Sequence, residues 1–269
     1  MRAAHQVVDD EPKIFRDPFA VEISESASGT RIEDVGAELM TPACKLLRSA
    51  MVLRSRYAED ELANAVGCGV RQYVLLGAGL DTYALRQPAQ AAHVRMFEVD
   101  TPGTQHWKAS LLEQRGVGLP PNVTYVGADL EKDDLAFSLR RVGFRADAPA
   151  FFSWLGVTQY LHEAAVEATL RQIAAFPAGS AVVFSFNPPE ETLDGVDRAE
   201  AQAAAARSLA AGGPWRTRPT AQDLQRCLAK LGFRGARHVA PAEAQEVYFG
   251  ERSDGLRAPR FEQLMCAFV

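Results

Sequence analysis

The stretch that decides the fold is Tyr73-Val74-Leu75-Leu76-Gly77-Ala78-Gly79-Leu80-Asp81-Thr82. Apolar residues run directly into Gly-x-Gly, which is typical of a buried strand followed by a tight turn. Glycine has no Cβ and accepts unusual backbone angles, so a ligand can approach the chain closely at Gly77 and Gly79. The stretch therefore predicts a ligand-binding loop at the carboxyl end of a strand.

Acidic residues end the next two apolar runs. Asp100 comes 23 residues after Gly77, close to the spacing at which an acid binds ribose hydroxyls. Asp129 ends the following run, where its carboxylate could accept a hydrogen bond from an adenine amino group. Each acid could instead cap a helix, and this alternative is strong for Asp100 because Thr101-Pro102 follows it.

The loop favours a ligand that contains adenosine but no pyrophosphate. A dinucleotide loop needs a third glycine, G-x-G-x-x-G, and Thr82 stands at that position. S-adenosylmethionine is the obvious ligand of this kind. Two alternatives stay open: a NAD-dependent oxidoreductase, which Thr82 disfavours, and a non-catalytic protein that binds S-adenosylmethionine.

Short apolar runs alternate with amphipathic ones after residue 70, which predicts an α/β fold with a doubly wound, mainly parallel sheet. The expected strands are Gln72–Leu76, Arg95–Val99, Val123–Val126, Ala150–Trp154, Ala181–Phe186, Phe233–His238 and Met265–Val269. The expected helices between them are Thr101–Arg115, Asp134–Val142, His162–Phe176 and Thr220–Leu231.

The chain is expected to divide near residue 68. Residues 1–68 have a helical pattern and are predicted to form a cap, whereas residues 69–269 form the Rossmann-like, S-adenosylmethionine-binding domain. An insertion near 187–219 follows a predicted strand and carries Pro188-Pro189 near its start. Loops at such a position border the ligand crevice, so the insertion is either a lid or a solvated surface loop.

Composition narrows the function classes. The 29 Lys and Arg against 34 Asp and Glu give a net charge of −5, unlike the basic footprint of a general nucleic-acid binder. No apolar stretch is long enough to span a membrane, and the four cysteines have no zinc-binding spacing. We therefore expect a cytoplasmic protein with a small-molecule partner and no nucleic acid, membrane or metal; a homodimer stays open.

The motifs resemble those of a known family. Gly77-Ala-Gly-Leu-Asp-Thr, Phe97-Glu-Val-Asp-Thr-Pro and Gly127-Ala-Asp-Leu resemble the leucine carboxyl methyltransferase family, and more closely its bacterial branch of S-adenosylmethionine-dependent O-methyltransferases. The resemblance covers nearly the whole chain. It implies a class I methyltransferase fold with seven strands, of which the last is antiparallel. Further matches are Phe15-Arg-Asp-Pro-Phe-Ala, Arg54-Ser-Arg-Tyr, Ser153-Trp-Leu-Gly-Val-Thr-Gln-Tyr-Leu and Tyr248-Phe-Gly-Glu-Arg.

The resemblance also implies roles for particular residues. Leu155 stands where the members that methylate protein phosphatases carry a cofactor-site glutamate, which puts phosphatase methylation in doubt and favours a small natural product as the acceptor. The implied cofactor contacts are Arg54 to the carboxylate, Gly77 and Gly79 to the methionine part, Asp100 to the ribose, and Asp129 with Leu130 to the adenine.

Arg54 has a plainer interpretation as a helix arginine paired with Glu59 or Asp60. Arg56 is close enough in sequence to be the cofactor-binding arginine instead.

The methyl acceptor is expected beside the end of the fourth strand, near Trp154, Gln159 and Tyr160. Tyr160 and His162 are the catalytic candidates, and Arg252 could pair with an acidic substrate. Trp154 could instead be a core aromatic, and His162 could simply open a helix. No histidine has a recognisable pairing with a group that would orient it as a base. A carboxylate acceptor, already ionised at neutral pH, is therefore favoured over a hydroxyl.

Overall fold

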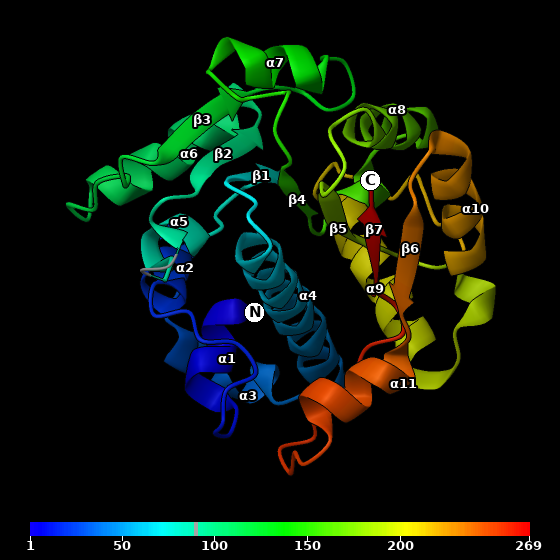
Figure 1. Ribbon diagram of the computed structural model, residues 1–269. Helices are drawn as coiled ribbons and strands as arrows, with labels where there is room; N and C mark the ends of the chain where they lie inside the picture. The colour runs from blue at the N-terminus through cyan, green and yellow to red at the C-terminus, as the bar shows by residue number, and fades with distance from the viewer. Residues whose placement is uncertain (89–90) are drawn as a thin grey trace.

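The computed structural model describes residues 1–88 and 91–269, and its core is a seven-stranded sheet between two layers of helices (Figure 1). The strand order is β3-β2-β1-β4-β5-β7-β6. Strands β1 to β5 pair in parallel, whereas β7 is antiparallel to both β5 and β6. The predicted doubly wound fold is confirmed, including its antiparallel seventh strand. The strands are β1 (Gln72–Leu76), β2 (Arg95–Asp100), β3 (Val123–Gly127), β4 (Phe151–Trp154), β5 (Ala181–Phe186), β6 (Gly235–Val239) and β7 (Gln263–Phe268).

Several helices begin at a capping side chain or end at a glycine. Thr41 caps α4 by accepting a hydrogen bond from the Cys44 N–H (3.3 Å), and Gly232, with φ of 98°, ends α10. None of the described helices is both long and apolar enough to cross a membrane. The helices are α1 (Arg2–Val8), α2 (Ala20–Ser28), α3 (Gly36–Leu39), α4 (Pro42–Gly67), α5 (Tyr83–Arg86), α6 (Pro102–Glu113), α7 (Leu135–Arg141), α8 (Glu163–Ala174), α9 (Gly195–Ala210), α10 (Ala221–Leu231) and α11 (Pro241–Ala244).

Strand residues alternate between the two faces of the sheet. On β1, Tyr73 and Leu75 pack toward α4, whereas Val74 and Leu76 pack toward α7, α8 and α10. On β4, the Ser153 hydroxyl lies 2.8 Å from the Tyr73 hydroxyl, on the α4 side. Trp154 therefore falls on the opposite face, where it is fully buried.

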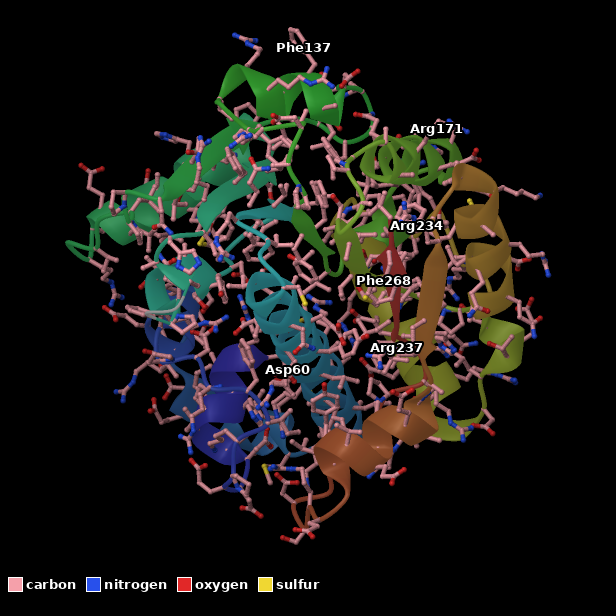
Figure 2. The ribbon with its side chains drawn as sticks, in the orientation of Figure 1. Asp60, Phe137, Arg171, Arg234, Arg237 and Phe268 are labelled. Carbon is pink, nitrogen blue, oxygen red and sulfur yellow. The ribbon has the colours of Figure 1, made fainter. Side chains whose placement is uncertain are left out.

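Residues 1–68 supply part of the central core, and their role as a cap stays a prediction. Apolar residues of α4, such as Leu53 and Leu62, are buried against the sheet. Arg237 of β6 forms an ion pair with Glu61 of α4 (2.8 Å), which ties the edge of the sheet to this helix; Figure 2 labels Arg237. Helix α4 is thus the element that joins the N-terminal segment to the sheet.

The N-terminal segment is anchored on α4 by a buried ion pair. Arg48 of α4 is fully buried and donates to both carboxylate oxygens of Asp9, at 2.7 and 2.9 Å. His5 Nδ1 lies 2.8 Å from the same carboxylate. This cluster holds α1 against α4 and places residue 2 beside the glycine loop.

The insertion near 187–219 is built around α9 and packs on α4. Leu193 and Ala201 share a buried cluster with Leu46 and Ala50 of α4. Beyond α9, the Arg216 N–H donates to the Gln159 carbonyl (2.7 Å). The insertion thus contains a helix that packs on α4 through part of its surface, and whether it serves as a lid or only as a surface segment stays a prediction.

Candidate functional site

A cavity of about 270 Å³ opens at the carboxyl ends of β1 and β4. The strand order changes direction here, because β2 and β3 lie on one side of β1 and β4 and β5 on the other. Ligands of open α/β sheets bind at such a point. Its wall comes from four separate parts of the chain. These are Arg2, then Met51, Arg54 and Ser55 of α4, then Leu75 to Asp81, and then Ser153 with Leu155, Gly156 and Val157.

The glycine loop is as tight as the sequence predicts. Gly77 and Gly79 have φ of 67° and 49°, a backbone region that favours glycine. A Cβ built on Gly77 would lie 2.4 Å from Val157 Cγ2, so no side chain fits there. The Gly77 N–H donates to the Val99 carbonyl of β2 (2.8 Å). The backbone of the loop therefore forms the cavity wall directly.

Asp100 is built into the rim of this loop. Its Oδ2 accepts from the Gly79 N–H (2.8 Å), and its Oδ1 accepts from the Thr101 N–H (2.7 Å). Thr101, not Asp100, caps α6, so the capping interpretation of Asp100 is wrong. A carboxylate has about four lone-pair sites, which leaves Asp100 able to accept from two ribose hydroxyls.

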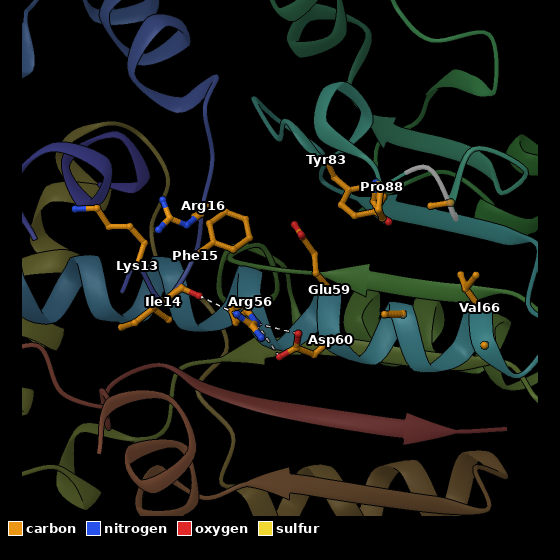
Figure 3. A pocket seen from close by; sticks show the side chains of 13 residues that line it. Lys13, Ile14, Phe15, Arg16, Arg56, Glu59, Asp60, Val66, Tyr83 and Pro88 are labelled. Atoms are coloured by element: carbon orange, nitrogen blue, oxygen red, sulfur yellow. Dashed lines mark hydrogen bonds and ion pairs between the residues drawn. The ribbon is translucent and has the colours of Figure 1, made fainter. Parts of the chain in front are cut away.

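Of the two candidate arginines, Arg54 faces the glycine loop. It forms an ion pair with Glu262 (2.8 Å), rather than with the Glu59 or Asp60 that sequence spacing suggested. Arg56 pairs with Asp60 (2.8 Å) on the other flank of α4. There it lines a separate cavity of about 680 Å³ that contains no residue of the glycine loop (Figure 3).

Asp129 and Leu130 lie after β3, two strands from the cavity in the sheet order. Asp129 Oδ1 accepts from the Glu131 N–H (3.0 Å), and Oδ2 accepts from Lys132 Nζ (2.6 Å). The hydrogen bond from Lys132 lowers the pKa of Asp129. Neither residue lines the 270 Å³ cavity, so their contact with adenine stays a prediction.

Arg2 and Asp81 form an ion pair in the cavity wall (2.9 Å). Burial alone would raise the pKa of Asp81, but Arg2 and Arg86 outweigh it and lower that pKa to about 2. Thr82, which replaces the third glycine, donates through its hydroxyl to Asp17 Oδ2 (2.7 Å). The N-terminal segment thus holds the glycine loop from outside.

Arg2, Asp17 and Glu262 lie in or next to the site but were not predicted from the sequence. Asp17 lies within the flagged Phe15-Arg-Asp-Pro-Phe-Ala motif, and that motif was the one signal for it. Nothing in the local sequence around Arg2 or Glu262 distinguishes them from surface charges.

The structure contradicts two of the acceptor predictions. Trp154 is a core residue, because strand alternation turns it to the face covered by α8. Arg252 donates to the Pro12 carbonyl (2.6 Å) and the Asp10 carbonyl (3.0 Å) and pairs with Asp254. It joins the C-terminal region to the N-terminal segment and does not line the glycine-loop cavity.

The other acceptor candidates do not line the 270 Å³ cavity, so their contact with an acceptor stays a prediction. Gln159 is buried, and Tyr160, which is 39% exposed, would be 3.6 Å from a Cβ on Gly213. His162 precedes α8, and its side chain is 61% exposed. Its Nδ1 lies 2.9 Å from Glu131 and its Nε2 lies 3.0 Å from Arg216. His162 is thus a surface residue that precedes a helix, and Glu131 is a carboxylate partner of the kind that orients a base, which the sequence did not reveal; a catalytic role for His162 stays a prediction.

Among residues 1–88 and 91–269, no group of three or more His, Cys, Asp or Glu side chains is placed to hold a metal ion.

Comparison with known proteins identifies the family. The family model of leucine carboxyl methyltransferase matches residues 1–174. YktD of Bacillus subtilis, named as an S-adenosyl-L-methionine-dependent methyltransferase, is 32% identical over 210 residues, which cover 76% of this chain and 67% of YktD. A Streptomyces coelicolor protein named in the same way is 36% identical over 169 residues, which cover 61% of this chain and 58% of that protein. The match thus spans about two thirds or less of these relatives.

Solved structures share the fold at low sequence identity. A DUF574 family protein from Streptomyces avermitilis superposes with a TM-score of 0.61 at 19% identity, covering 93% of this chain and 96% of that one. A Thermobifida fusca protein named as a methyltransferase superposes with a TM-score of 0.57 at 16% identity, covering 96% of this chain and 97% of that one. These similarities define a class I methyltransferase fold.

The protein belongs to the leucine carboxyl methyltransferase family, and its cofactor is S-adenosyl-L-methionine. The residues present fit that cofactor. The glycine loop offers bare backbone, Asp100 retains lone pairs for a ribose, and only one N–H of the Arg54 guanidinium donates to an oxygen of a described residue.

Proposed function

We propose that this protein is an O-methyltransferase that transfers the methyl group of S-adenosylmethionine to a carboxylate, or else a hydroxyl, of a small natural product. The observation that carries the proposal is the placement of Arg54, the Gly77–Gly79 loop and Asp100 around the carboxyl ends of β1 and β2. Similarity to methyltransferases, together with Thr82 in place of the third glycine, disfavours the oxidoreductase alternative.

The bound cofactor supplies an electrophilic methyl group on a positively charged sulfur. Arg54, the Gly77–Gly79 loop and Asp100 would hold this cofactor, which would become S-adenosylhomocysteine once its methyl group has passed to an acceptor oxygen. The protein contributes to the reaction by holding the acceptor and the methyl group in reacting geometry and by excluding water.

The cavity wall favours a carboxylate acceptor. Its ionisable side chains are Arg2, Arg54 and Asp81. The Asp81 pKa of about 2 makes that carboxylate too weak a base to deprotonate a phenol, whose pKa is near ~10. A carboxylic acid with a pKa near ~4 loses its proton in solution and needs no base.

The test has two stages. Isothermal titration with S-adenosylhomocysteine, with NAD as the parallel ligand, should give micromolar binding of the first and none of the second. Purified protein with methyl-labelled S-adenosylmethionine should then label free acids but not their methyl esters. NAD binding alone would refute the methyltransferase assignment. Tight cofactor binding with no labelled acid or hydroxyl would favour the non-catalytic alternative.

A further inference from the structure

Glu262 is a buried carboxylate that pairs with Arg54, a residue of the 270 Å³ cavity wall. It precedes β7 directly and is 7% exposed. Its Oε1 accepts from Arg54 Nη1 (2.8 Å). No described residue donates a hydrogen bond to its other oxygen, Oε2. The carboxylate therefore has one oxygen available for a ligand.

Arg54 fixes where this carboxylate lies. A Cβ built on Gly156 would be 2.5 Å from Arg54 Nη1, so the guanidinium packs directly on the Gly156 backbone. Arg54 Nη2 also lies 3.6 Å from Met51 Sδ. Gly156, Met51 and Arg54 all belong to the cavity wall. Glu262 is thus one hydrogen bond away from that wall.

The cofactor's amino-acid end is a zwitterion and needs an anion as well as a cation. Among the described residues, Asp81 is the one carboxylate that lines the cavity itself, and each of its oxygens already accepts one hydrogen bond. Its Oδ1 accepts from the Tyr83 N–H (2.7 Å), and its Oδ2 accepts from Arg2 (2.9 Å). Glu262 Oε2, by contrast, accepts from no donor in the described parts of the chain, so this oxygen keeps its full capacity to accept from an ammonium group.

Stability alone gives little reason for this buried pair. Desolvating two charges costs about as much as their attraction returns, so a buried ion pair is weak evidence for a stabilising role. The guanidinium has five N–H donors, and only one of them donates to an oxygen here. Both partners of the pair therefore keep hydrogen-bonding capacity that no described residue uses.

We infer that Glu262 accepts a hydrogen bond from the α-ammonium group of the cofactor while Arg54 holds its α-carboxylate. Glu262 is then a positioning residue that selects ligands with a free amino group and sets the orientation of the methionine chain. This inference rests on the proposed cofactor site.

The experiment compares two ligands by isothermal titration: S-adenosylhomocysteine and its analogue without the α-amino group. In Glu262→Gln, the affinity for S-adenosylhomocysteine should fall by at least about tenfold, as expected for a lost hydrogen bond between charged groups. The affinity for the deamino analogue should stay within about twofold of wild type, because this ligand has no group for Glu262 to bind.

A matched control is Asp197→Asn. Asp197 is also a buried carboxylate paired with an arginine, Arg257 (2.7 Å), but it lies on α9 outside the cavity wall. Both ligands should bind this variant as they bind wild type. If Glu262→Gln fails to fold, Glu262→Asp keeps the charge and shortens the side chain, and it should reduce the preference for the amino-bearing ligand.

The inference is overturned if Glu262→Gln binds S-adenosylhomocysteine normally or loses the same factor for both ligands. An equal loss would mean that Glu262 acts only through Arg54 or the fold. Failure of wild type to bind either ligand is a different result, because it removes the proposed cofactor site itself.

Discussion

Gly77 and Val157 meet so closely that a Cβ on residue 77 would come 2.4 Å from Val157 Cγ2. The first residue of the glycine loop is thus clamped by the segment that follows β4. Because of this contact, the residue type allowed at position 77 is limited by Val157, which lies eighty positions later in the chain.

Gly77→Ala should weaken binding of S-adenosylhomocysteine by at least tenfold, because Val157, which lines the same cavity, must shift to make room for the new methyl group. Gly116→Ala is the matched control. Gly116 has almost the same φ, 65°, but open space around it, so this variant should lose only about 1–2 kcal/mol of stability to backbone strain. Titration and urea unfolding of both variants check this, and equal binding by the two would refute the clamp.

Asp100→Asn should reduce cofactor affinity by roughly 1–3 kcal/mol, the loss expected for hydrogen bonds to a charged group. Thr101→Ala is the comparison, since it removes the cap of α6. It should cost about 1 kcal/mol of unfolding free energy and leave affinity unchanged. If Asp100→Asn lowers stability but not affinity, Asp100 only supports the loop.

The Asp9–Arg48 pair should make stability depend on acidic pH. Burial alone would raise the pKa of Asp9, but hydrogen bonds from His5 and Arg48 lower it to about 2. The pKa of Asp9 is therefore lower in the folded state than in the unfolded state, where it is about 3.9. Ionised Asp9 consequently stabilises the folded protein at pH values above about 3.9. The contribution, about 2 kcal/mol, is lost as the pH falls from about 5 to 2.

Urea unfolding of wild type and Asp9→Asn measures this contribution. Wild type should be the more stable at pH 7, and the difference should shrink by about half at pH 3. A difference independent of pH would mean that Asp9 is not the titrating group.

Arg252→Ala should release the N-terminal segment rather than change substrate binding. The side chain joins the Asp10 and Pro12 carbonyls to the C-terminal region. Limited proteolysis should cut faster near residues 10–16 in this variant. Arg16→Ala removes an exposed arginine paired with Glu11 and should behave like wild type. Unchanged cleavage in Arg252→Ala would show that this connection does not hold the segment.

Much of the fold could be predicted because each buried strand appears in the sequence as a short run of consecutive apolar residues. The predicted limits of Gln72–Leu76 and Ala181–Phe186 agree with β1 and β5. The sixth strand begins at Gly235 rather than at Phe233, because Gly232 and Phe233 close the end of α10. Hydrophobic pattern alone does not separate a helix end from a strand start.

The site was less predictable because its ion pairs connect distant parts of the chain. Arg54 and Glu262 are 208 residues apart, so local spacing pointed instead to Glu59 or Asp60. Trp154 is a different case. The alternation that places Ser153 beside Tyr73 already turns its neighbour away from the cavity. This correction could have been made from the strand pattern.

The strand order β5-β7-β6 imposes an order on assembly of the molecule. Within the sheet, β6 pairs with β7 alone, and β7 comes after it in the chain. During synthesis, β6 and the preceding α10 leave the ribosome before the strand that connects them to the sheet. Ribosome-bound chains that stop before residue 263 can build the parallel half of the sheet, but they leave β6 unpaired and β5 as an exposed edge, the kind of surface that chaperones bind.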